Sequence, residues 1–103
     1  MKEINAADAL AKVKNEEAIM VDVREDYEVE ELSYDVPNLL HIPLGDLPTR
    51  KDELPKDKAL IMACRSGVRS GNATQFLSNE GFEVENLKGG IMNWQNNDMP
   101  TKS

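Results

Sequence analysis

We expect a single domain over residues 1–103, because a chain of this length with 40% hydrophobic residues can bury a core without staples. Its 19 acidic and 12 basic residues give a formal net charge of −7, which argues against nucleic acid and anionic membrane surfaces as partners. The single cysteine excludes an internal disulfide, and no apolar run suits a signal segment or a membrane span, so a reducing, cytoplasmic setting is expected.

Apolar periodicity predicts alternating strands and helices along the first half of the chain. The expected elements are a short strand at 2–4, a helix from Asn5 to Lys14, a strand at 18–23, a short helix at 26–32, a loop at 33–38 and a short helix or irregular turn at 44–54. Asn5 is a suitable N-cap for the first helix. The strand at 18–23 is continuously apolar, which is typical of a strand buried on both faces of a parallel sheet.

Two charged residues, Asp22 and Arg24, lie at the end of that strand. Ligand sites in open α/β sheets lie at the carboxyl ends of the strands, so both are expected near the cysteine if the two strands are neighbours. Asp22 would hold an arginine or loop N–H groups, and Arg24 would brace the adjoining segments. A strand-end ion pair of purely structural value is the alternative.

Negative charge gathers just after this strand, in an acidic stretch. Its members are Glu25, Asp26, Glu28, Glu30 and Glu31. A solvated helix or turn face explains such a run, and a docking surface for a basic partner is the alternative.

The second half of the chain continues the alternation. The expected elements are a buried strand at 59–63, a polar loop at 64–70, a helix at 70–79, a strand at 82–87, a turn at 88–90, a final helix that holds Trp94 in the core, and a frayed tail from Asp98. The turn contains Gly89 and Gly90, which would let the backbone pass close to the polar loop. The whole pattern predicts an α/β three-layer sandwich around a mostly parallel, about five-stranded sheet flanked by helices.

The polar loop Cys64-Arg65-Ser66-Gly67-Val68-Arg69-Ser70 lies where a strand gives way to a helix, an arrangement that aims backbone N–H groups at an anion. The positive end of the helix, the inward N–H groups and the charges of Arg65 and Arg69 would each favour the thiolate form of Cys64. Gly67 suits a left-handed turn, and Ser70 is a good N-cap. A lone buried cysteine is often an inert small hydrophobe. Two arginines and a glycine beside it, however, indicate an anion site that contains a nucleophile.

This loop, which we call the Cys64 loop, resembles the active-site loop of the rhodanese (sulfurtransferase) family. Three further stretches resemble family signatures in the expected order, namely Val21–Glu25, Ile42–Leu44 and Gly81–Trp94. The chain departs from the family in lacking a Gly-His-Ile before the middle strand. Its only histidine, His41, lies later and is given no catalytic role.

The resemblance implies a two-step sulfur transfer through a persulfide on Cys64, the catalytic residue, without a metal or an organic cofactor. The residues that would bind the substrate are Arg65, Ser66, Gly67, Val68, Arg69 and Ser70. Asp22 and Arg24 would hold this loop in position without contacting the substrate. The donor would be a small anion such as thiosulfate, or a protein such as a cysteine desulfurase, and a thiol, cyanide or a sulfur-carrier protein would accept the sulfur.

Two other classes of function stay open from the sequence. A phosphatase or arsenate reductase also uses a cysteine and an arginine around an anion loop, but the related cell-cycle phosphatases have a loop one residue longer than the four residues between Cys64 and Arg69. A noncatalytic binding module is the second alternative, although inactive rhodanese domains commonly lack the cysteine.

Overall fold

The computed structural model describes residues 1–103, and its elements follow the expected order. The strands are β1 (Glu3–Ile4), β2 (Ala18–Asp22), β3 (Ser33–Tyr34), β4 (Leu40–His41), β5 (Ala59–Ala63), β6 (Val84–Leu87) and β7 (Thr101–Lys102). The helices are α1 (Ala6–Lys14), α2 (Asp26–Glu31), α3 (Leu47–Arg50), α4 (Val68–Asn79) and α5 (Gly90–Asn96), and single 3₁₀ turns at Leu44–Asp46 and Lys51–Glu53 flank α3.

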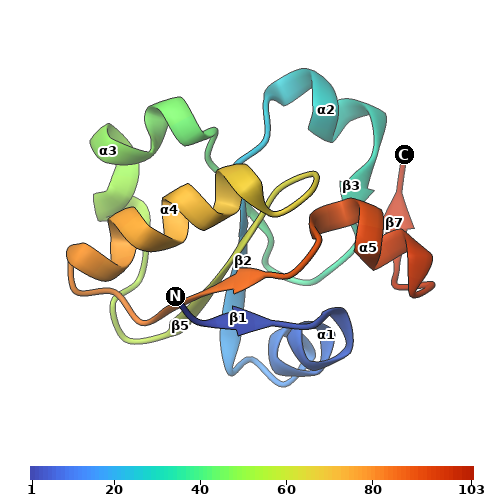
Figure 1. Cartoon of the computed structure of the whole chain (residues 1–103), viewed down its shortest axis with the longest axis horizontal. Coiled ribbons are helices and arrows are strands. Elements are labelled where there is room, and N and C mark those ends of the chain that lie inside the picture. Colours follow the sequence, from blue (N-terminus) through green and yellow to red (C-terminus); the bar gives the residue numbers. More distant parts are fainter.

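Five strands form one sheet in the order β1-β6-β5-β2-β4, and every pairing in it is parallel (Figure 1). Strand β5 is the central strand and β2 lies beside it, and both are apolar except for Asp22 at the end of β2, as expected for strands covered on both faces. The predicted α/β fold with a five-stranded sheet is therefore confirmed. A second, two-stranded antiparallel sheet joins β3 to β7.

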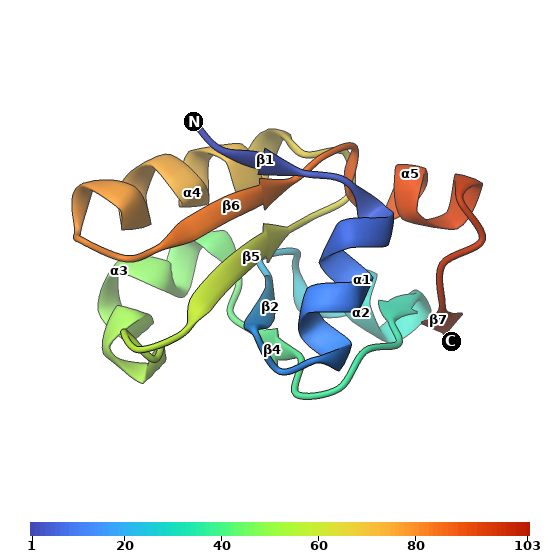
Figure 2. The ribbon, with the colours of Figure 1, turned by 90° about the horizontal axis from the view of Figure 1, so that it is seen from below.

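Helices cover both faces of the large sheet, so the molecule has three layers (Figure 2). One core cluster contains α1 and α5 side chains with Tyr34 and Trp94, and the other contains α3 and α4 side chains with Cys64. The side chains of β5 alternate between the two clusters, with Ile61 in the first and Met62 in the second, because successive strand residues point to opposite faces. Trp94 is fully buried, as predicted.

The register of the two central strands brings the predicted site residues to one edge of the sheet. Asp22 pairs with Ala63, so the segments that follow β2 and β5 leave the sheet side by side. Cys64 and Arg24 are thereby placed on neighbouring segments at the carboxyl edge, as the sequence predicts.

The prediction of a frayed tail is wrong. Residues 101–102 form β7 against β3, the Trp94 indole N–H donates to the Pro100 carbonyl at 2.8 Å, and the Asp35 N–H donates to the same carbonyl at 3.0 Å. These bonds hold the end of the chain to α5 and β3, which also replaces part of the loop expected at 33–38. No helix is both long and apolar enough to cross a membrane.

Candidate active site

The Cys64 loop folds around its own sulfur atom. Cys64 is almost fully buried, and its Sγ accepts a hydrogen bond from the Gly67 backbone N–H at 3.1 Å and lies 3.2 Å from the Ser70 hydroxyl. Gly67 takes the predicted left-handed conformation, with φ of +103°, and is the N-cap of α4. The predicted N-cap, Ser70, instead lies in the first turn of α4, because the helix begins earlier and turns the hydroxyl inward to the sulfur.

Two opposing effects decide the ionisation of Cys64. Burial favours the neutral thiol, but the Ser70 hydroxyl and the backbone N–H groups of Ser70, Gly67 and Ser66 outweigh it and lower the pKa of Cys64 below its usual value. Of the three features expected to favour the thiolate, the inward N–H groups are the ones that lower the pKa here, together with the Ser70 hydroxyl. The arrangement can stabilise a negative charge on the Cys64 sulfur.

Asn86, from β6, fixes the loop from inside the protein. Its side-chain N–H donates to the Gly67 carbonyl at 3.1 Å, and its Oδ1 lies 2.6 Å from the Ser70 hydroxyl. The side chain is buried and therefore needs both partners. Asn86 thus joins the turn at Gly67 to the first turn of α4.

The carbonyl side of the loop is held by α5 and β3. The Cys64 carbonyl accepts from the Tyr34 hydroxyl at 2.7 Å and from the Ile91 N–H at 2.9 Å, and the Arg65 carbonyl accepts from the Met92 N–H at 3.2 Å. Burial raises the pKa of Tyr34 well above its usual value, so the phenol stays a donor. The N–H groups at the start of α5, which have no partner within the helix, therefore donate to carbonyls of the Cys64 loop.

Asp22 and Arg24 form a buried ion pair beside this network. The Arg24 guanidinium donates to both Asp22 carboxylate oxygens, with the shortest distance 2.8 Å, and also donates to the Leu32 carbonyl at 2.9 Å. The guanidinium carbon lies 5.5 Å from the ring centroid of Tyr34, whose hydroxyl holds Cys64. The Arg24 guanidinium also donates to the Glu28 carbonyl at 3.5 Å. The pair therefore connects to the loop through Tyr34 and through Glu28, which binds Arg69 of the loop, and Arg24 joins β2 to α2 and the segment after it.

The two arginines of the loop are in different electrostatic states. The Arg69 guanidinium donates to both carboxylate oxygens of Glu28, at 2.7 and 2.9 Å, whereas Arg65 is exposed and has no carboxylate partner. Glu28 belongs to the acidic stretch for which the sequence analysis favours a solvated face, but this residue is directed at the loop. Arg65 is therefore the loop cation that is free to meet an incoming anion.

The ion pair with Arg69 makes part of the stability depend on pH. It lowers the pKa of Glu28 from 4.5 to about 2, so the pair stabilises the fold above about pH 4.5 and is lost as the pH falls toward 2. We expect Glu28→Gln to lower the free energy of unfolding near pH 7 by only about 1 kcal/mol, because the Arg69 side chain is 35% exposed and solvent screens the pair. Glutamine can still accept the Glu25 backbone N–H that Glu28 accepts at 3.1 Å.

Urea unfolding of the wild type and Glu28→Gln between pH 2 and 7 measures this contribution. The difference between them should shrink as the pH falls below 4.5. Glu30→Gln, an exposed change in the same helix, is the matched control and should leave the pH profile unaltered. A constant difference at every pH would contradict the role of the Glu28 charge.

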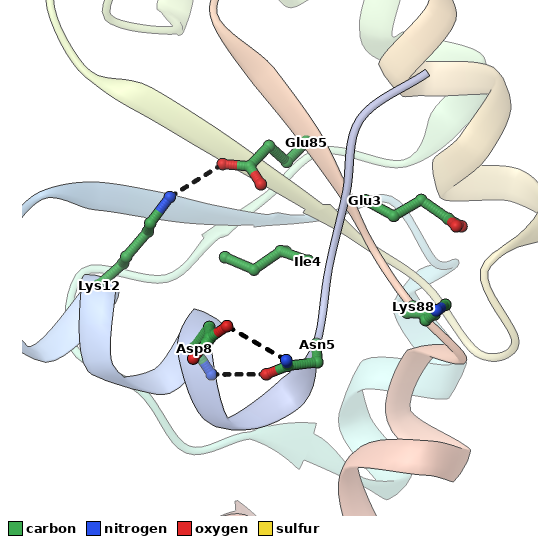
Figure 3. Close-up of a pocket in the computed structure, with 7 residues that line it drawn as sticks. All are labelled: Glu3, Ile4, Asn5, Asp8, Lys12, Glu85 and Lys88. Atoms are coloured by element: carbon green, nitrogen blue, oxygen red, sulfur yellow. Dashed lines mark hydrogen bonds and ion pairs between the residues drawn. The ribbon is translucent and has the colours of Figure 1, made fainter.

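Of three surface cavities, one lies beside the Cys64 loop. Its volume is about 180 Å³, and its lining residues are Arg24, Glu28, Glu31, Leu32, Arg65, Ile91, Met92 and Gln95. A larger cavity of about 390 Å³ lies between α1 and the β1–β6 edge, and no predicted site residue lines it (Figure 3). There Lys12 is paired with Glu85 at 3.1 Å and Asn5 with Asp8, so its charged groups already satisfy one another in part (Figure 3).

Three residues of this site, Tyr34, Asn86 and Glu28, are not predicted from the sequence. Tyr34 lies in a segment expected to be a loop, and Glu28 is one of several acidic residues in its stretch. Asn86 does carry a signal, because it continues the alternating apolar positions of Phe82, just before β6, and Val84, at its start, with a polar residue. A polar residue at such a position needs a buried partner.

The family model for the rhodanese-like domain matches residues 5–97. YtwF of Bacillus subtilis (strain 168) is 41% identical over 101 residues, which cover 97% of this chain and 96% of YtwF. The thiosulfate sulfurtransferase GlpE of Glaesserella parasuis serovar 5 (strain SH0165) is 32% identical over 100 residues, covering 95% and 90% of the two chains. A rhodanese-related protein from Thermoplasma volcanium has a solved structure with a TM-score of 0.90 at 31% identity, covering 99% of this chain and 98% of that one. The likeness extends over nearly the whole chain in sequence and in fold.

Proposed function

The chain belongs to the rhodanese-like domain family, and we propose that it is a sulfurtransferase that carries sulfur as a persulfide on Cys64. One observation carries the proposal. The Cys64 sulfur is held by the Gly67 N–H and the Ser70 hydroxyl in a loop that lowers its pKa. A thiolate surrounded by donors at the start of a helix is suited to attack sulfur and then to stabilise a persulfide anion.

The first half of the reaction loads the enzyme. The Cys64 thiolate attacks the outer sulfur of thiosulfate, a new S–S bond forms, and the old S–S bond breaks with its electron pair leaving on sulfite. In the second half an acceptor thiolate or cyanide attacks the outer persulfide sulfur, and Cys64 leaves as the thiolate. No net redox agent or cofactor is needed, because each step exchanges one bond to sulfur for another.

Different residues of the Cys64 loop would stabilise the negative charges of the donor, of sulfite and of the persulfide. Arg65, free of any carboxylate, would meet the anionic donor and offset the charge that develops on sulfite. The backbone N–H groups of Ser66, Gly67 and Ser70 face Cys64 and would hold the outer persulfide sulfur. Arg69 would contribute less than the sequence analysis expects, because Glu28 already neutralises it.

The same ion pair weighs against the phosphatase and arsenate reductase alternative. A phosphate dianion in the loop would have to compete with Glu28 for the Arg69 guanidinium, which two hydrogen bonds already hold. The short loop supports the same preference. The noncatalytic alternative fits poorly with a complete set of donors around the Cys64 sulfur.

The surface around the loop favours a polypeptide as the donor or the acceptor. Three of the four large hydrophobic side chains that are exposed, Tyr27, Val68 and Met92, lie around it, with 66%, 70% and 50% of their surface exposed. Val68 is in the loop, Met92 donates its N–H to Arg65, and Tyr27 precedes the Glu28 that holds Arg69. Apolar contacts would not stabilise bound thiosulfate, whereas a cysteine desulfurase or a sulfur-carrier protein would bury these side chains on binding. The exposed acidic groups of α2 would then favour a basic partner surface.

Intact mass after incubation with thiosulfate tests the proposed chemistry. We expect the wild type to gain one sulfur atom, Cys64→Ala to gain none, and cyanide or a thiol to remove the added sulfur. A persulfidated cysteine desulfurase is the second donor, and faster loading by it than by thiosulfate supports the protein partner. No added sulfur from either donor, with turnover of a phosphate ester or arsenate, would move the protein to the phosphatase class.

A further inference from the structure

The Ser70 hydroxyl has one proton and lies within hydrogen-bonding distance of two acceptors. Its oxygen is 2.6 Å from Asn86 Oδ1 and 3.2 Å from Cys64 Sγ. Because a hydroxyl donates only once, it donates to one of these atoms at a time. All three side chains are buried, so water does not readily replace the bond that is not made.

The orientation of the Asn86 amide is fixed by its second partner. The Asn86 side-chain N–H donates to the Gly67 carbonyl at 3.1 Å. A flipped amide would place its oxygen against that carbonyl, which is also an acceptor. The Asn86 oxygen therefore faces Ser70 and competes with Cys64 for the hydroxyl proton.

We propose that Asn86 is a positioning residue that draws the Ser70 hydroxyl away from Cys64, and so favours the thiol and the sulfur-loaded forms of the enzyme over the free thiolate. In the thiol form the Cys64 S–H donates to Ser70, and the Ser70 O–H donates to Asn86. In the thiolate form the hydroxyl rotates to the sulfur anion, and the Asn86 oxygen loses its donor. The Ser70 O–H bond rotates but does not break.

Loading with sulfur returns the hydroxyl to Asn86. In the persulfide the negative charge lies on the outer sulfur, and the inner Cys64 sulfur is neutral and a weak acceptor. The Ser70 hydroxyl is then free to donate to Asn86 again. This part rests on the proposed function, whereas the effect on the ionisation of Cys64 does not. Asn86 also keeps the thiolate from being overstabilised, which would reduce its nucleophilicity.

A double-mutant cycle of Asn86→Ala and Ser70→Ala isolates this competition. We expect Asn86→Ala to lower the pKa of Cys64 by about 0.5–1 unit, because the Ser70 hydroxyl then has no competing acceptor and donates to the thiolate. Ser70→Ala should raise the pKa. In the Ser70→Ala background, the Asn86→Ala change should have no effect, since the hydroxyl through which Asn86 acts is gone.

The rate of alkylation by iodoacetamide as a function of pH measures the Cys64 pKa, because the protein has no other cysteine. The other titratable or charged groups around Cys64 are Tyr34, Arg65, Arg69 and the Asp22–Arg24 pair. All of them are unchanged in the four proteins of the cycle. Asn79→Ala, at the exposed end of α4, is the matched control and should leave the pKa unaltered.

Two results would overturn the proposal: a pKa that rises in Asn86→Ala, or a shift of equal size with and without the Ser70 hydroxyl. A purely structural role would produce the second result. Should the alanine variant fail to fold, Asn86→Leu keeps most of the side-chain volume, removes both polar groups and has the same expected sign. The folded state of each variant is checked by urea unfolding.

Sulfur loading gives a second readout. At a pH above the Cys64 pKa, where the empty enzyme is the thiolate, and at a fixed ratio of thiosulfate to sulfite, intact mass should show the ratio of loaded to empty enzyme falling about 3- to 10-fold in Asn86→Ala, the same free energy as the pKa shift. An unchanged ratio would contradict the return of the hydroxyl in the persulfide. If no variant and not even the wild type takes up sulfur while the pKa cycle holds, the proposed function fails and the role of Asn86 in ionisation stands.

Discussion

Replacing Asp22 with asparagine is expected to lower the free energy of unfolding by about 3–5 kcal/mol. Asp22 is completely buried, and Arg24 is 3% exposed. The carboxylate accepts from the Arg24 guanidinium and from its backbone N–H, the latter at 3.0 Å. Asparagine keeps the size of the side chain but removes the negative charge, so the Arg24 cation would stay buried without compensation. A loss of this size is a large share of the stability of a small domain.

Urea unfolding at neutral pH measures the effect of Asp22→Asn. The matched control is Glu53→Gln, which removes one carboxylate charge from the exposed Arg50–Glu53 pair, where the shortest distance is 2.9 Å. That change should leave the stability nearly unaltered, because exposed ion pairs contribute little. Equal losses of unfolding free energy in the two variants would contradict the prediction that removing one charge from the buried pair costs more than removing one from an exposed pair.

The same pair explains how the central strands and the active loop depend on one another. Arg24 contacts Asp22 on β2, the Leu32 carbonyl after α2, and the ring of Tyr34, and Tyr34 in turn donates to the Cys64 carbonyl. The position of the pair in the sequence allows two roles, support of the loop or a strand-end ion pair of structural value. The geometry combines them, because Arg24 holds Asp22 at the end of β2 and also contacts Tyr34 and the Glu28 carbonyl, whose residues bind the Cys64 loop.

Local patterns in the sequence were enough to predict the parts of the fold that depend on neighbouring residues. The apolar runs of β2 and β5 predicted central strands, and a cysteine, a glycine and two arginines between a strand and a helix predicted the Cys64 loop. The conformation of Gly67 followed from the tight turn that the loop must make.

Contacts between distant residues could not be predicted in this way. The hydrogen bonds from Ser70 to Asn86, from Tyr34 to Cys64 and from Arg69 to Glu28 join residues that are 16, 30 and 41 positions apart. Each depends on the order of strands in the sheet and on how helices pack against it. The two-residue strand β7 is a similar case, since its only signal is the partner it meets in β3.

Gly90→Ala is expected to lower the free energy of unfolding by about 2–5 kcal/mol and to disturb the Cys64 loop. Gly90 has φ of +58°, and a Cβ atom there would lie 2.4 Å from the Arg65 carbonyl carbon and oxygen and 2.7 Å from the Cys64 carbonyl oxygen. The left-handed conformation costs a non-glycine residue roughly 1–2 kcal/mol, and overpacking adds roughly 1–3 kcal/mol. The obstructing atoms are backbone, so no side chain can rotate away to relieve the contact.

The strain at Gly90 should also change the pKa of Cys64, because Gly90 precedes the residues that hold the Cys64 loop. The next two residues, Ile91 and Met92, donate their N–H groups to Cys64 and Arg65, so moving α5 away by the width of a methyl group breaks the bonds that hold the carbonyl side of the loop. We therefore expect the pKa of Cys64, measured by the pH dependence of alkylation, to rise toward that of a free thiol as the N–H groups lose their alignment. Gly45→Ala is the matched control, because a Cβ atom at Gly45 meets nothing within 4 Å. It should change stability by less than about 1 kcal/mol and leave the Cys64 pKa unaltered. A Gly90→Ala protein as stable and as reactive as Gly45→Ala would show that the close approach of α5 does not shape the loop.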